Sequence, residues 1–130
     1  MKSFTIFLKL AALGFIAASL LHLIFGLGAD AMLGAKLSSE ALTDPTLNSQ
    51  NRFYGTAFAL YGVLLYLCAT DMRRYEPVLM SVLAVYFLAG CARLVSIATH
   101  GMPPPLVLVL LALELLPPPL IIYWYLKAKP

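Results

Sequence analysis

The chain has 130 residues, of which 62% are hydrophobic and only 12% are charged, and its mean hydropathy is +0.88. These values lie outside the range of ordinary soluble domains, so they indicate a membrane protein. The formal net charge of +3 would fit a nucleic-acid partner, but the basic residues stand in short clusters between long apolar runs. Such clusters are topology signals in membrane proteins, so no nucleic acid is expected as a partner.

Four apolar runs each approach the ~20 residues that an α-helix needs to cross ~30 Å of hydrocarbon. They cover residues 4–28, 53–70, 78–99 and 106–126. Residues 29–51 form a polar loop, in which Ser38-Ser39-Glu40 is a start signal for a short surface helix. The other two connections are short, so neighbouring helices must be antiparallel. We therefore expect an all-α fold, an integral membrane four-helix bundle that forms a single domain over residues 1–130.

The basic residues predict the orientation of this bundle. Two of them, Lys36 and Arg52, lie on the side of the long loop, and six lie on the other side: Lys2, Lys9, Arg73, Arg74, Lys127 and Lys129. Cytoplasmic segments of membrane proteins are rich in Lys and Arg. Both termini are therefore expected in the cytoplasm, and residues 29–51 are expected outside it.

The fourth apolar run contains three consecutive prolines, Pro117-Pro118-Pro119. Proline has no backbone N–H, so the carbonyls of Leu113, Glu114 and Leu115 lose their helical donors. We expect the fourth helix to kink or unwind there, near the middle of the membrane.

His22, Arg93 and Glu114 are the unusual residues inside the apolar runs, because each ionisable group there costs at least ~2.5 kcal/mol unless it finds a partner or water. Counted from the outer helix ends, His22 and Arg93 lie about 9 Å deep, Glu114 about 12 Å and Tyr61 about 13 Å. These depths predict one polar layer to which all four helices contribute. Arg93 and Glu114, on neighbouring antiparallel helices, are expected to form a charge-assisted pair.

Above this layer, polar and aromatic residues suggest a funnel that opens outward. The candidate ligand-binding residues are His22, Asn51, Arg52, Tyr54, Tyr61, Arg93, His100 and Glu114. No metal-ligand spacing is present, and haem held by His22 and His100 is not favoured because their depths differ by about 9 Å. We therefore expect neither a metal nor a cofactor. A purely structural interpretation stays open, since a buried Arg–Glu pair can simply fix helix register.

Several motifs resemble a bacterial family of small membrane proteins known as domain of unknown function 4345. They are Asn51-Arg52-Phe53-Tyr54-Gly55, the segment Gly90-Cys91-Ala92-Arg93-Leu94-Val95-Ser96, Gly101-Met102-Pro103 and Glu114-Leu115. The resemblance runs from about residue 48 to the C-terminus and less clearly through the first helix. It implies four helices and no assigned reaction. We expect the protein in the bacterial inner (cytoplasmic) membrane. The proline triplets at 103–105 and 117–119 have more consecutive prolines than the family pattern.

Three functions fit these features. In the first, the protein binds or processes a small lipid-like or anionic molecule at the polar site, and Arg93 and Arg52 hold the charged group of that molecule. Alternatively, it is an accessory subunit that packs on a larger membrane complex or on a second copy of itself. A proton-coupled transporter is less favoured, because such small transporters need inverted pairing and the charge bias predicts one orientation. No nucleophile and base are spaced so as to name a reaction, so enzymatic activity stays open.

The orientation can be tested with topology reporters. A reporter fused after Lys129 should be active only as the type that works in the cytoplasm, and one inserted near Ser39 only as the exported type. The opposite pattern would show that the basic residues do not set the orientation, and the depth count from the outer ends would then fail.

Overall fold

The computed structural model describes residues 1–129, and these residues contain eight α-helices. In chain order they are α1 (Lys2–Phe25), α2 (Leu27–Met32), α3 (Ser39–Thr43), α4 (Pro45–Ala57), α5 (Ala59–Thr70), α6 (Glu76–His100), α7 (Pro105–Leu115) and α8 (Pro117–Ala128). Helices α4 and α5 together form one long helical unit, as do α7 and α8. The resulting four units are long and apolar enough to span a membrane. The expected all-α, four-helix membrane fold is therefore confirmed.

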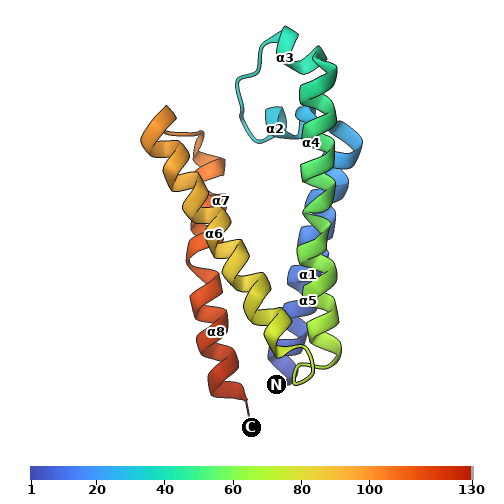
Figure 1. Cartoon of the computed structure of the whole chain (residues 1–130), viewed down its shortest axis with the longest axis vertical. Coiled ribbons are helices and arrows are strands. Elements are labelled where there is room, and N and C mark those ends of the chain that lie inside the picture. The colour runs from blue at the N-terminus through green and yellow to red at the C-terminus, as the bar shows by residue number, and fades with distance from the viewer. Residues whose placement is uncertain (130) are drawn as a thin grey trace.

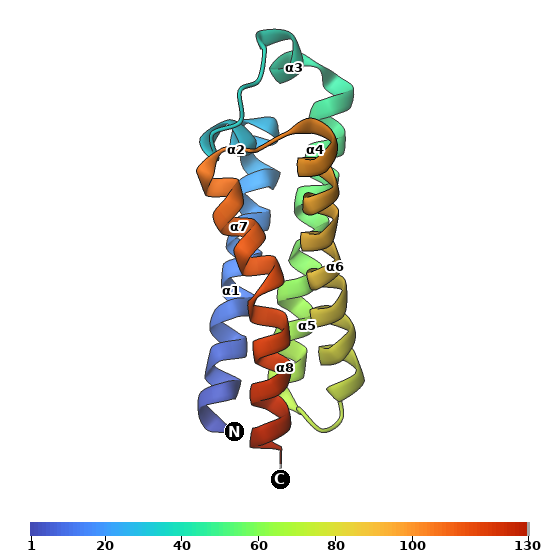
Figure 2. The same ribbon diagram turned by 90° about the vertical axis from the view of Figure 1, so that its left-hand side faces the viewer.

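The four spans form two antiparallel hairpins (Figure 1). One hairpin consists of α1 with α4 and α5, and the other of α6 with α7 and α8. Both chain termini lie at one end of the molecule, here called the terminal end, and α2 and α3 lie at the opposite end, here called the loop end (Figure 2). The hairpins meet at the terminal end and diverge toward the loop end (Figure 1).

The second span begins earlier than the sequence suggested, at Pro45 instead of Phe53. The Asp44 side chain accepts a hydrogen bond from the Leu47 N–H at 2.8 Å, and Pro45 takes the first helical position. Both features are strong helix starts. The connection predicted over residues 29–51 is therefore shorter than expected, because residues 45–51 belong to α4, and it contains α2 as well as α3. The short helix expected after Ser38 is confirmed as α3, capped by the Ser38 hydroxyl.

Two of the four spans are interrupted near their middle. The second is broken at Phe58, whose carbonyl accepts from the Tyr61 N–H only three residues on, at 3.2 Å. The fourth is broken at Leu116, so Pro117, Pro118 and Pro119 form the first turn of α8, where no N–H is needed. The kink expected from the proline triplet is confirmed. Its consequence is that the carbonyls of residues 113–115 have no backbone donor four residues on.

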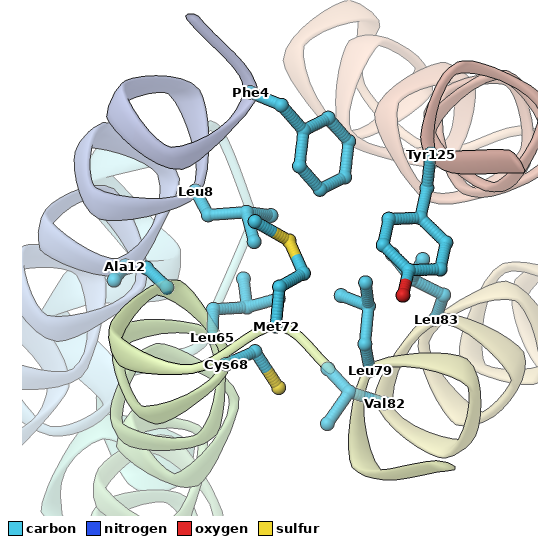
Figure 3. Packing of buried hydrophobic residues seen from close by; sticks show 11 residues of the cluster. Phe4, Leu8, Ala12, Leu65, Cys68, Met72, Leu79, Val82, Leu83 and Tyr125 are labelled. Carbon is cyan, nitrogen blue, oxygen red and sulfur yellow. The ribbon is translucent and has the colours of Figure 1, made fainter. Parts of the chain in front are cut away.

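The hydrophobic core lies in the terminal half of the bundle (Figure 3). It contains residues from all four spans and the turn after α5: Phe4, Leu8, Ala12, Leu65, Cys68, Ala69, Met72, Leu79, Val82, Leu83 and Tyr125. Phe4 also packs edge-on against Trp124, with ring centroids 5.0 Å apart, which joins α1 to α8. Burial of these side chains holds the two hairpins together at this end.

An ion pair adds a second link at the terminal end. Lys129 Nζ lies 2.8 and 2.7 Å from the two carboxylate oxygens of Glu76, and the Tyr125 hydroxyl donates to the same carboxylate at 3.1 Å. The hydrogen bond to Glu76 raises the pKa of the Lys129 ammonium above its ordinary value. The chain end is thereby tied to the start of α6.

Within the first hairpin, α1 and α5 approach closely at Gly62. A Cβ atom on Gly62 would lie 2.6 Å from the Ala12 carbonyl oxygen and 2.8 Å from a side-chain carbon of Ile16. Backbone cannot yield easily, so only glycine allows this spacing. Small residues at such positions are the usual means of close helix packing in membranes.

We expect Gly62→Ala to lower the free energy of unfolding by roughly 1–3 kcal/mol, because the added methyl group overpacks the α1–α5 contact. Gly14→Ala is the matched control, since a Cβ there meets no atom within 4 Å. The measurement is reversible unfolding in mixed micelles with increasing sodium dodecyl sulfate. Equal stability of the two variants would contradict the close packing.

Candidate functional site

Arg93 on α6 and Glu114 on α7 form the contact that their similar depths predicted. The Arg93 Nε–H donates to Glu114 Oε2, and the two atoms are 2.6 Å apart. The two side chains differ in exposure, because Glu114 is 5% exposed and Arg93 is 40% exposed. Gly90 makes room for the pair, since a Cβ there would lie 2.9 Å from the Glu114 Cβ. The carboxylate is therefore packed into the second hairpin, and the guanidinium reaches out from it.

The pair uses only part of the hydrogen-bonding capacity of Arg93. A guanidinium has five N–H donors, and only the one on Nε has an acceptor among residues 1–129. The two Nη atoms, which carry the other four, are free of protein acceptors in this part of the chain. An arginine held in this way presents a planar edge that suits a carboxylate or a phosphate group.

An aromatic cluster lies on the terminal side of this pair and joins the two hairpins. It consists of Phe15 on α1, Phe58 and Tyr61 on the second span, and Tyr86 on α6. The Tyr86 ring centroid is 5.1 Å from that of Phe15 and 5.5 Å from that of Tyr61. Tyr86 precedes Arg93 by seven residues, so the cluster lies about 10 Å nearer the terminal end.

A separate polar cluster lies at the loop end of the first hairpin, around His22. Its Nδ1 is 3.0 Å from the Ala18 carbonyl oxygen, and its Nε2 is 3.7 Å from Asp30 Oδ1. The Asn51 amide donates to the other Asp30 oxygen. Gly55 faces the His22 ring so closely that any Cβ would overlap it. His22 therefore connects α1 with α2 and α4.

Arg52 belongs to this loop-end cluster and not to the pair on the second hairpin. Its Nη1 donates to the carbonyl oxygens of Leu23 and Ile24, the second at 3.2 Å. Its Nε donates to Asn48 Oδ1 at 2.8 Å. A cation is favourable at the carbonyl end of a helix, so Arg52 caps α1. It shares no hydrogen-bond partner with Arg93.

The remaining candidates lie at the surface. Tyr54 is 66% exposed and its ring packs against that of Phe53, with centroids 5.4 Å apart. His100 is exposed at the end of α6, where its Nδ1 lies 2.7 Å from the Thr99 hydroxyl. Neither residue contacts Arg93 or Glu114 through a hydrogen bond in the described chain.

The expectation of one layer with a residue from every helix is wrong for Tyr61, which packs on Tyr86 and so lies about 10 Å nearer the terminal end than Arg93. His22 lies opposite Gly55, and Tyr61 follows Gly55 by six residues, so the two side chains differ in depth by about 9 Å. The error came from the outer end of the second span, because this span starts at Pro45 instead of Phe53. The structure thus divides the candidates into the Arg93–Glu114 pair with Tyr61 beneath it, the loop-end cluster, and the exposed Tyr54 and His100.

Several residues of these clusters were not among the sequence candidates: Phe15, Asp30, Asn48, Phe58 and Tyr86. Tyr86 had a local signal, because it precedes Arg93 by two helical turns on the same face of α6. Asp30 had none, since its contact with Asn51 joins residues 21 positions apart. Among residues 1–129, no group of three or more His, Cys, Asp or Glu side chains is placed to hold a metal ion.

Comparison with known families identifies the chain. The family described as "Domain of unknown function (DUF4345)" matches residues 3–125, so the chain belongs to this family over almost its whole length. The resemblance seen in the motifs is therefore confirmed and extends through the first helix. No curated protein and no solved structure matches the chain. The function has to be argued from the site.

The unequal exposure of Arg93 and Glu114 predicts unequal effects of removing each. Arg93→Ala leaves a nearly buried carboxylate without its partner and should lower the free energy of unfolding by about 3 kcal/mol. Glu114→Ala leaves a half-exposed guanidinium that can reach water or lipid head groups, so its cost should be about 1 kcal/mol. The double variant should cost less than the sum, measured by the same unfolding in mixed micelles. Strictly additive effects would show that the two groups do not interact.

Proposed function

We propose that this protein binds a small lipid-like molecule with an anionic head group, and that Arg93 holds that group. The observation that carries the proposal is the half-exposed guanidinium inside a membrane-spanning helix, bonded through Nε alone. A cation in an apolar span is costly, and such residues mark binding sites or transport pathways in membrane proteins. The two Nη atoms supply the donors for the bound anion.

Glu114 has the role of a positioning residue in this proposal. The Glu114 Cβ lies against Gly90, and its nearly buried carboxylate accepts from Arg93 Nε, which orients the free edge of the guanidinium. Tyr61 and Tyr86 lie on the terminal side of the pair and separate it from the core.

The location of the site follows from the proposed topology. Six basic residues gather near the terminal end, and Trp124 lies there beside Phe4 and Phe7. Basic and aromatic residues of this kind favour the cytoplasmic face, which supports the proposal that the termini lie in the cytoplasm of a bacterial cell. Arg93 then lies in the outer leaflet of the inner membrane.

The alternative function is that of an accessory subunit, and one observation favours it. In the most apolar stretch of the fourth span, only 11% of the residues are buried within the chain. So large an exposed face can contact lipid alone, or it can pack on a larger membrane complex or a second copy. In that case Arg93 and Glu114 would only fix the register of α6 and α7.

Binding of palmitate to the purified protein in a non-ionic detergent distinguishes these functions. Arg93→Gln should weaken binding about tenfold or more, as expected for the loss of a charge-assisted hydrogen bond. Arg74→Gln is the matched control, because it removes the same charge from an exposed residue at the terminal end and should leave the affinity nearly unchanged.

A second variant distinguishes a loss of binding from a loss of the fold. Arg93→Gln combined with Glu114→Gln replaces the ion pair by two amides that can still bond to each other, so it should remain folded and still lose the ligand. If this variant is folded and binds palmitate as tightly as the unaltered protein, the binding proposal fails and the accessory role stands.

A further inference from the structure

We infer that the groove between the second span and α6 holds a single hydrocarbon chain, the tail of the molecule whose head group binds Arg93. This inference rests on the proposed function. The groove has a volume of about 690 Å³, within the range of ligand pockets in proteins. Its walls come from both hairpins, with Tyr54, Ala57 and Leu64 on one side and Val78 and Val85 on the other.

The lining of the groove fits hydrocarbon and little else. Ser81 is the one non-aromatic polar side chain in it, and its hydroxyl already donates to the Pro77 carbonyl at 2.8 Å. The rest of the lining is aliphatic or aromatic. A polar occupant would leave its hydrogen-bonding groups without partners there, whereas an alkyl chain has none to satisfy.

The groove leads along α6 toward Arg93. Val78, Val82 and Val85 line it, and Ala89 and Arg93 continue the same series at spacings of three or four residues. Such a series lies on one face of a helix. The rise from Val78 to Arg93 is about 22 Å, and the hairpins diverge in that direction (Figure 1). A molecule with its head at Arg93 can therefore extend its tail down this face toward the terminal end.

The volume limits the occupant to one chain. A methylene group is about as large as a water molecule, which takes about 30 Å³ in the liquid, so the groove holds roughly 20 carbon atoms. Surrounding lipid is as apolar as the groove, so the groove fixes where the hydrocarbon chain lies and adds little to the affinity for the ligand. The distinguishing observation is therefore where the end of the chain lies.

The test uses a 16-carbon fatty acid with a photoreactive diazirine on its last carbon, cross-linked to the full-length protein and mapped by mass spectrometry. Labelling is expected at the terminal part of the groove, on Leu64 and Val78. Ala57→Trp fills the groove and should reduce this labelling at least fivefold, whereas octanoate, whose chain is short, should still bind. Ala17→Trp is the matched control, because Ala17 is an exposed alanine on α1 outside the groove. Labelling of Leu64 and Val78 should persist in this variant.

Each result decides a different claim. Labelling spread over lipid-facing residues such as Leu10 and Leu88, with binding still dependent on Arg93, would overturn the groove and leave the proposed function intact. Labelling of the groove that is unaffected by Ala57→Trp would likewise overturn it. Binding of both fatty acids that is independent of Arg93 would refute the proposed function and this inference with it.

Discussion

In the hydrocarbon of a membrane, every polar group has to find its partner inside the protein, and this constraint explains most of the structure. Helices satisfy their own backbone, so the chain is helical in all four spans. Where a helix ends, another group takes over, as Arg52 does at the carbonyls that close α1. Where a charge lies within a span, as at Arg93, an opposite charge is placed on the neighbouring helix.

The two halves of the bundle satisfy this constraint differently. The terminal half is closed by a core drawn from all four spans and by the Glu76–Lys129 pair (Figure 3). The loop half is held within each hairpin by polar contacts, His22 with Asp30 in one and Arg93 with Glu114 in the other. Both interrupted spans, at Phe58 and Leu116, are broken between these halves. The result is a fixed base with two hairpins that diverge above it.

The fold was predictable from sequence because its signals are local. Four apolar runs of membrane length fix the spans, and the missing N–H groups of Pro117–Pro119 fix the break in the fourth. The Arg93–Glu114 pair was predictable because short connections make α6 and α7 antiparallel. The start of the second span was missed because residues 45–52 are polar, although Asp44-Pro45 is a good helix start. The His22–Asp30–Asn51 contacts and the groove depend on how distant segments fold back and on the angle between hairpins, which no local pattern encodes.

The asymmetry of the Arg93–Glu114 pair bears on whether it serves structure alone. A pair that only fixes register gains nothing from free donors, because each unpaired polar group in a span is costly. Here the carboxylate is buried and the guanidinium is half-exposed, bonded through one nitrogen of three. Arg93 lies on α6 beyond the groove, in the same helical series as Val78, Val82 and Val85, which line it. A cation beyond a hydrocarbon-lined groove complements an anionic amphiphile, whose head group is negatively charged and whose tail is apolar. This complementarity connects the pair to a ligand.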